Sequence, residues 1–173
     1  MKTPTLEALQ NAGWHLDIKE GKFQLPAPLQ QRYPRLPQSL IDFLSGLQLC
    51  RNTGDTAWFL CKEDYEGTTE SAFRWNEFEL MELEWASQDN DTEWQATVKE
   101  FWDKHFPFLL SVKTGYAFFA VSLKEHNFGA VVHGYEPEFP DVSEQSPSFE
   151  EFLDCLVKAV QEPETEGLIQ TVI

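Results

Sequence analysis

Apolar residues recur at helical spacing in four separate stretches of this chain. The clearest stretch, 148–160, carries one apolar stripe made of Phe149, Phe152, Leu153, Leu156, Val157 and Val160. Ser148 suits the N-cap position, Glu151 completes a capping box, and Pro163 ends the pattern. The same reasoning predicts helices over 3–12, over 37–46 and, with Asp91 as N-cap, over 91–106.

Runs of β-branched and aromatic residues predict strands elsewhere. Three such runs follow one another over 106–112, 115–123 and 127–136, and short polar connections separate them, as in an antiparallel meander. A further strand is expected over 56–61. Alternation over 14–25, with a turn at Glu20–Gly21, predicts a small hairpin near the N-terminus.

Other segments have weaker patterns. Segment 74–86 sets its apolar residues among glutamates, which favours an acidic amphipathic helix, although partial alternation leaves a strand open. The proline-rich segment 26–37 predicts an irregular connector, and 62–72 and 137–147 predict polar loops. Segment 163–173 is expected to be a loosely attached tail, unless its apolar end docks on the domain.

The order of these elements predicts an α+β fold in one domain. A central, mostly antiparallel or mixed β-sheet would be flanked by α-helices. A chain of 173 residues suits a single domain with a substantial core. We expect an N-terminal extension over 1–34, the α+β domain over 35–162 and a C-terminal tail over 163–173.

The chain is strongly acidic, with 29 Asp and Glu against 13 Lys and Arg and a net charge of −16. Two blocks hold most of this charge: 62–103 has 13 acidic and 3 basic residues, and 135–173 has 10 and 1. Such a surface repels nucleic acid and anionic membranes and attracts cationic partners. Solubility alone is the alternative explanation for the acidity.

Cysteine usage and hydropathy indicate where the protein would work. Cys50, Cys61 and Cys155 are odd in number and widely spaced, which favours reduced thiols over a disulfide framework or zinc ligands. No apolar run is long enough to span a membrane, and the N-terminus lacks the apolar region of a signal peptide. We therefore expect a cytoplasmic protein without a membrane partner.

Residue patterns for catalysis or metal binding are missing from the sequence. Residues 89–100 place acids as a calcium loop does, but Trp94 takes the position that needs glycine. No phosphate-binding, nucleophile-elbow or dinucleotide-binding glycine motif occurs. The histidines are scattered without a second ligand at metal spacing: His15, His105, His126 and His133. We expect no catalytic residue, cofactor or metal, hence no enzyme; an unrecognised hydrolase is the remaining alternative.

Two of the six tryptophans stand out by their surroundings. Trp75 and Trp85 lie in the most acidic predicted helix, and an aromatic residue with nearby carboxylates is a composition found at protein interfaces. Core packing explains most tryptophans and is the alternative here too.

Three segments resemble the SUKH superfamily, a group of bacterial immunity proteins that includes relatives of the yeast cell-wall assembly regulator. RLPQSLIDFLSG (35–46) is similar to the opening helix of that family. Segment 106–136 is similar to its core strands, and SPSFEEFL (146–153) to its closing helix. The chain departs from the family pattern after Gly46, where Leu47–Gln48–Leu49 stands in place of an Asn-Gly turn.

The resemblance implies an immunity protein that neutralises a cognate toxin, often a nuclease or nucleic-acid deaminase, by covering its active site. Because a nuclease must be cationic to hold phosphates, an acidic protein can associate with it quickly. The expected partner is a cationic protein rather than nucleic acid; the alternative is a regulatory scaffold with an endogenous partner. The sequence predicts no oligomeric state. The expected contact residues are Trp75, Glu77, Glu79, Glu82, Glu84, Glu136, Glu138 and Asp141.

Overall fold

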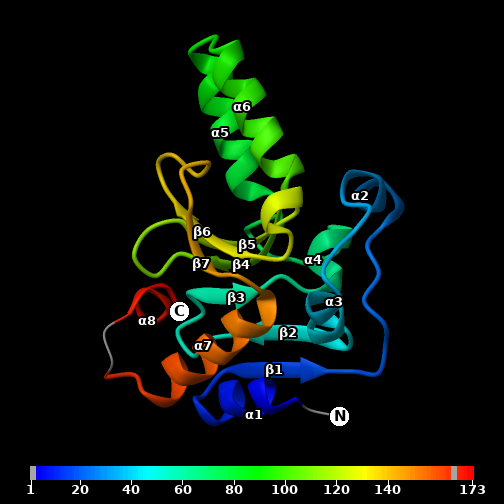
Figure 1. The fold of residues 1–173 in the computed structure, drawn as a ribbon, viewed down its shortest axis with the longest axis vertical. Helices are drawn as coiled ribbons and strands as arrows, with labels where there is room; N and C mark the ends of the chain where they lie inside the picture. Colours follow the sequence, from blue (N-terminus) through cyan, green and yellow to red (C-terminus); the bar gives the residue numbers. More distant parts are fainter. Residues whose placement is uncertain (1–2, 165–166) are drawn as a thin grey trace.

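The computed structural model describes residues 3–164 and 167–173, and its centre is one antiparallel sheet. The described strands pair in sequence order, so each lies beside its neighbours along the chain (Figure 1). They are β1 (His15–Ile18), β2 (Leu47–Arg51), β3 (Ala57–Phe59), β4 (His105–Ser111), β5 (Ala117–Ser122), β6 (Val131–Tyr135) and β7 (Ser143–Ser146). The predicted α+β fold with a single sheet is confirmed.

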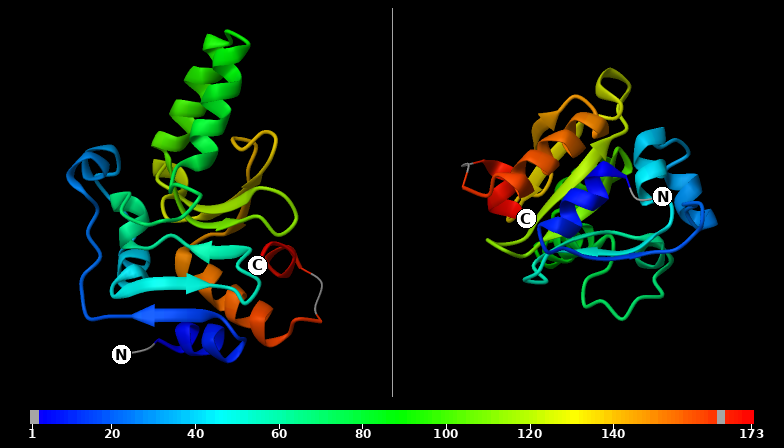
Figure 2. Two further views of the ribbon diagram at one scale, coloured as in Figure 1. Left: turned by 180° about the vertical axis from the view of Figure 1, so that it is seen from behind. Right: turned by 90° about the horizontal axis from the view of Figure 1, so that it is seen from below.

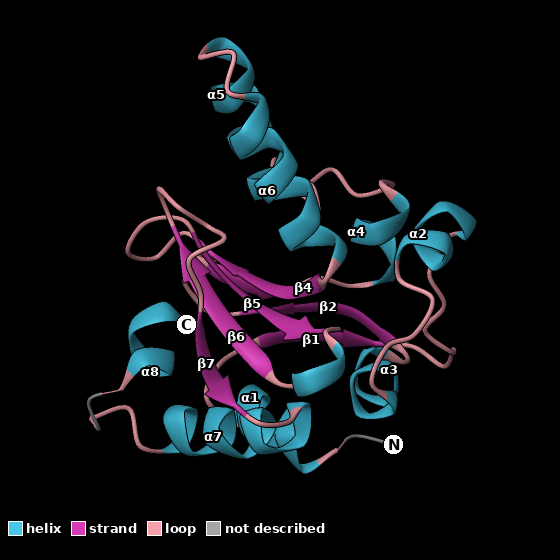
Figure 3. Cartoon of the chain, turned by 45° about the horizontal axis from the view of Figure 1, so that its top comes forward, coloured by secondary structure: helices cyan, strands magenta, loops and turns pink. Residues whose placement is uncertain are grey.

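Two groups of helices cover the two faces of the sheet (Figures 2 and 3). One face carries α1 (Pro4–Asn11), α3 (Gln38–Leu44), α7 (Phe149–Gln161) and α8 (Leu168–Val172). The other face carries α2 (Ala27–Arg32), α4 (Lys62–Glu66), α5 (Glu77–Gln88) and α6 (Thr92–Asp103). A short 3-10 turn, η1 (Glu125–Asn127), links β5 to β6.

Adjacent aromatic residues on β5 serve the two faces separately. The Phe118 ring packs on Trp102 of α6 at 4.8 Å between centroids, while Phe119 packs on Phe152 of α7 at 5.0 Å. Every residue of β4 and β5 is buried, because both faces are covered. The central strands therefore read as continuous apolar runs rather than as an alternation.

Three predicted N-caps are confirmed. The side chains of Thr3, Asp91 and Ser148 accept hydrogen bonds from backbone N–H groups at the starts of α1, α6 and α7. The acidic segment is a helix, α5, and the strand alternative for 74–86 is wrong. The three-stranded meander is confirmed as β4, β5 and β6.

The predicted hairpin over 14–25 is wrong. Strand β1 pairs instead with β2, a strand that the sequence analysis did not predict. Phe23 and Leu25 are buried side chains of an extended connection, and the Phe23 ring meets Tyr65 edge-on at 5.6 Å. Strand β1 pairs with β2 rather than with residues 22–25, because Phe23 and Leu25 point into the core instead of forming a strand beside β1.

Three segments expected to be irregular contain short elements. The connector 26–37 includes α2, loop 62–72 includes α4, and loop 137–147 includes the edge strand β7. The C-terminal segment docks, as the alternative expectation allowed. Val172 on α8 is 3% exposed, and its carbonyl accepts a hydrogen bond from the Ser111 hydroxyl.

Candidate functional site

Helices α5 and α6 form an antiparallel hairpin that stands away from the sheet (Figure 1). Its base is held in the core by buried Phe78 and Phe101. Between Arg74 and Lys99 the chain has no Lys or Arg. We call residues 84–94 the hairpin tip, and its exposed carboxylates are Glu84, Asp89, Asp91 and Glu93.

Trp85 is the exposed aromatic residue of the hairpin tip. Its side chain is 42% exposed, whereas Trp102 on the partner helix is 2% exposed. Burying a large ring against a partner releases much apolar surface from water, so an exposed tryptophan among carboxylates suits an interface. The tip thus combines an apolar anchor with uncompensated negative charge.

The loop between β6 and β7, residues 136–142, packs on the base of this hairpin. The ring of Phe139 stacks on Phe78 with 4.7 Å between centroids and 11° between planes. The Phe139 N–H donates a hydrogen bond of 3.2 Å to Oε1 of Glu82. These contacts bring the loop part of the second acidic block to the first block, although the hydrogen-bonded residues are 57 positions apart.

Gly134 makes this loop position possible. It lies opposite Phe118 in the β5–β6 ladder. A Cβ at Gly134 would come within 2.5 Å of the Phe118 ring and 2.7 Å of the Phe139 carbonyl oxygen. The missing side chain therefore lets the aromatic ring and the loop backbone approach β6 closely.

Glu82 is a buried carboxyl at the junction of the hairpin and the loop. Its side chain lies inward, with the residue 1% exposed. Its Oε2 atom and the indole Nε1 of Trp102 are buried and form no hydrogen bond of ordinary geometry. The pKa of Glu82 is raised to about 7, mainly by burial and also by Glu138 and Glu79. The hydrogen bond from the Phe139 N–H and the nearby indole N–H of Trp102, which is too poorly aligned for an ordinary hydrogen bond, act in the opposite direction.

Glu79 is also buried, and its partner is Arg32 from α2. The guanidinium donates two hydrogen bonds to the Glu79 carboxylate, of 2.7 and 2.9 Å, and one of 2.8 Å to Asp103. Burial opposes the charge of Arg32, but the hydrogen bonds to Glu79 and Asp103 raise its pKa above the ordinary value. This network ties the connector to both helices of the hairpin.

The structure therefore corrects part of the expected contact surface. Glu79 and Glu82, at 4% and 1% exposure, are not solvated rim carboxylates, because the hairpin turns them toward Arg32 and Phe139. Trp75 is half-buried, with its ring beside Tyr33 at 6.2 Å, so it packs more than it projects.

The remaining expected residues lie on or near the surface. Glu77 is half-buried beside Arg74, and Glu136 accepts a 2.9 Å hydrogen bond from the Tyr116 N–H. Glu84, Glu138 and Asp141 are exposed.

Residues at the tip and the junction were missed as site residues by sequence reasoning. The sequence places Asp89, Asp91 and Glu93 in a poor calcium pattern and Asp91 also at a helix N-cap, and the expected contact set leaves out these three residues and Trp85. The available signal for Phe139 was its large apolar ring in a loop of proline and acidic residues, because phenylalanine is among the residue types most often fully buried.

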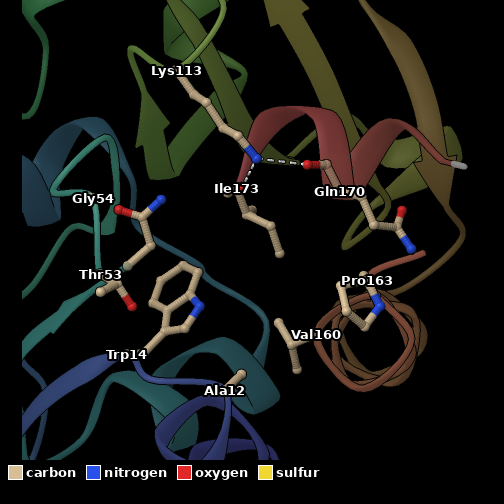
Figure 4. Close-up of a pocket in the computed structure, with 11 residues that line it drawn as sticks. Ala12, Trp14, Thr53, Gly54, Lys113, Val160, Pro163, Gln170 and Ile173 are labelled. Carbon is tan, nitrogen blue, oxygen red and sulfur yellow. Dashed lines mark hydrogen bonds between the residues drawn. The ribbon is translucent and has the colours of Figure 1, made fainter. Parts of the chain in front are cut away.

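A depression of about 300 Å³ lies on another side of the molecule, among α1, the β2–β3 turn, α7 and α8 (Figure 4). Trp14 and Ile173 line it, together with Lys113. The Lys113 ammonium donates hydrogen bonds to the carbonyl oxygens of Gln170 and Ile173, so it fastens α8 to the sheet. This arrangement favours a structural part for the lysine.

Two histidines outside the junction are buried, and burial disfavours their charged forms. Burial lowers the pKa of His105 to about 4, and its Nδ1 bonds the Phe101 carbonyl at 2.8 Å. Burial likewise lowers the pKa of His133. Among residues 3–164 and 167–173, no group of three or more His, Cys, Asp or Glu side chains could hold a metal ion.

No helix within the described ranges has the length and apolar character needed to cross a membrane. Comparisons of the chain with models of protein families, with curated proteins and with solved structures found no match. The geometry of the hairpin and its loop therefore carries the functional argument.

Proposed function

We propose that this chain is a non-enzymatic protein-binding protein of the immunity type, which neutralises a cationic toxin through its acidic surface. One observation carries the proposal: the hairpin projects from the sheet, and the β6–β7 loop, which holds Glu138 and Asp141 of the second acidic block, packs against its base through Phe139. An exposed Trp85 supplies an apolar anchor within that surface. A nuclease or nucleic-acid deaminase has the matching charge, because it must bind phosphates.

Membership of the SUKH superfamily is part of this proposal. Its support is the likeness of segments 35–46, 106–136 and 146–153, which lie next to one another in the fold. Phe43 of the first packs on Phe149 of the third with 5.7 Å between centroids, and Phe149 packs on Phe108 of the second at 5.1 Å. We further propose that the protein works in the cytoplasm.

Affinity capture of the tagged protein from its own cells, with mass spectrometry of the retained proteins, tests the proposal first. We expect a basic protein retained at low salt and encoded beside this gene, and we expect the purified chain to block its activity. Retention of a neutral host regulator that this chain does not inhibit would contradict the immunity function.

Charge and anchor variants then test the surface itself. Asp89→Asn with Glu93→Gln should slow association with the captured partner, most at low salt, because steering between exposed charges is screened as the Debye length falls from about 10 Å at 0.1 M to about 3 Å at 1 M. Trp85→Ala should instead speed dissociation and weaken binding by on the order of 2 kcal/mol. A matched control, Glu150→Gln with Asp154→Asn on α7, removes the same charge from the opposite side and should leave both rates unchanged.

A regulatory scaffold with an endogenous partner is the second candidate, and one observation favours it. A depression of about 330 Å³ near α2 and α3 is lined partly by apolar side chains, including Phe23, Leu36 and Ile41. The affinity for a partner bound there would change little with salt concentration, because apolar contacts are not screened by ions. Loss of that partner on Ile41→Glu, with Trp85→Ala silent, would identify this function instead.

A further inference from the structure

Three parts of the chain meet at the buried carboxyl of Glu82: helix α5, helix α6 and the β6–β7 loop. Oε1 of Glu82 holds the N–H of Phe139, and the Phe139 ring lies on Phe78. Oε2 of Glu82 and Nε1 of Trp102 are buried without a hydrogen bond of ordinary geometry. The loop is therefore attached to the hairpin through a polar group that is incompletely satisfied.

The charged groups that face Glu82 all disfavour a second negative charge there. Glu79 lies on the same helix and is paired with Arg32, and Glu138 belongs to the loop. Helix α6 faces the carboxyl with the uncharged indole of Trp102. Burial is the largest cause that raises the pKa of Glu82, and Glu138 and Glu79 add to it. A proton on Glu82 removes these penalties and leaves Oε1 able to accept from Phe139.

We propose that Glu82 is a proton-operated latch, which holds the β6–β7 loop against the α5–α6 hairpin when protonated and lets the loop separate when ionised. Ionisation strengthens the hydrogen bond that Oε1 accepts from Phe139, but the larger costs of burial and of nearby Glu138 then act on the carboxylate. Movement of the loop relieves both costs, because it admits water and carries Glu138 away. The latch regulates the acidic surface of the proposed function, because Glu138 and Asp141 travel with the loop. The effect of the latch on binding rests on the proposed function, whereas the movement of the loop does not depend on it.

NMR of the free protein tests the latch. The ¹³Cδ shift of Glu82 reports its titration, and exchange of the Phe139 amide, corrected for hydroxide catalysis, reports the opening of the loop. From about pH 5 to about pH 9 we expect exchange to accelerate with the midpoint of the Glu82 titration, by about tenfold for each unit of pKa shift that opening relieves. Glu82→Gln should remove this step, and Glu84→Gln, an exposed position on the same helix, should keep it.

Glu138→Gln is a second test, and it leaves the buried core unchanged because Glu138 is exposed. It removes a like charge from the loop, so both midpoints should move together to lower pH. The latch is overturned if Phe139 exchange shows no step while Glu82 titrates, or if Glu82→Gln keeps the step. Because no partner is present, such a result would leave the proposed binding function standing. Failure of partner capture would equally leave the latch intact.

Discussion

Helices α7 and α5 cover opposite faces of the same sheet and use their surfaces in opposite ways. Helix α7 buries Phe149, Phe152 and Leu156 completely and turns its carboxylates outward. Helix α5 buries Glu79 and Glu82 and leaves Trp85 exposed. In α7 the apolar side chains face the core and the charged ones face water. Helix α5 reverses this arrangement at Glu79, Glu82 and Trp85, and such reversals are expected where function competes with stability.

The difference also concerns what each helix needs from the rest of the chain. The apolar stripe of α7 packs on sheet side chains by apolar contact alone, as Phe152 does on Phe108 and Phe119. Helix α5 requires two specific polar partners, Arg32 from the connector and the Phe139 N–H from the loop. A buried carboxylate is tolerated only with such partners, so the position of α5 depends on the connector and the β6–β7 loop. Helix α7 needs only the apolar face of the sheet.

Truncation of Phe152 should give the largest effect on stability. Phe152→Ala removes a fully buried ring from α7, and we expect a loss of about 4 kcal/mol in the free energy of unfolding, measured by urea denaturation. Exposed Glu150→Ala on the same helix should change it by less than about 0.5 kcal/mol. A loss below about 1 kcal/mol for Phe152→Ala would show that α7 is not the main support of its face.

Removal of the buried charge on α5 should give the next largest effect, with a defined pH dependence. The ordinary pKa of 4.5 applies to Glu82 in the unfolded chain, and the folded value is about 7. The protonated form therefore stabilises the fold fully below about pH 4.5, and this contribution is lost as pH rises through about 7.

The unfolding free energy of Glu82→Gln minus that of wild type should therefore rise by about 3 kcal/mol from about pH 4.5 to about pH 8. Any constant cost of the amide cancels in this comparison. Glu84→Gln, on the exposed side of α5, serves as control and should follow wild type. Parallel curves for Glu82→Gln and wild type would mean that Glu82 is ionised in the fold at ordinary pH.

Breaking the other polar partnership of α5 should cost less. Arg32→Met leaves Glu79 buried without its partner, and we expect a loss of about 2 kcal/mol, because Arg32 is itself partly exposed. Adding Glu79→Met should recover most of that loss. Lys62→Met breaks the more exposed Lys62–Glu66 pair and should cost below about 0.5 kcal/mol. If Arg32→Met and Lys62→Met lowered the free energy of unfolding equally, the buried pair would contribute no more than the surface pair.

The smallest effect on stability is expected at the hairpin tip. Trp85→Ala should change the free energy of unfolding by less than about 1 kcal/mol, because the ring is 42% exposed. The same variant should have the large effect on partner binding described above. A loss of several kcal/mol on thermal or urea unfolding would instead identify Trp85 as a packing residue.

Local pattern was sufficient for several parts of this fold. Helix α7 with its Ser148 cap, helix α6 with its Asp91 cap, and the β4–β6 meander were predicted near their observed bounds, since capping and periodicity act over a few residues. Strand β7 was missed because its sequence is polar, although it pairs with the neighbouring β6. Strand β2 was missed because it pairs with the distant β1. The hairpin over 14–25 was wrong for the same reason.

The sequence by itself determined that this protein is an acidic α+β chain with an amphipathic closing helix, and that its negative charge lies in two blocks. Only the tertiary structure decided which carboxylates face the core. Arg32 and Phe139 reach Glu79 and Glu82 from 47 and 57 positions away, and the orientation of α5 follows from those contacts. A helical pattern shows that one side is buried; when glutamates and tryptophans occupy both sides, long-range partners select which side it is.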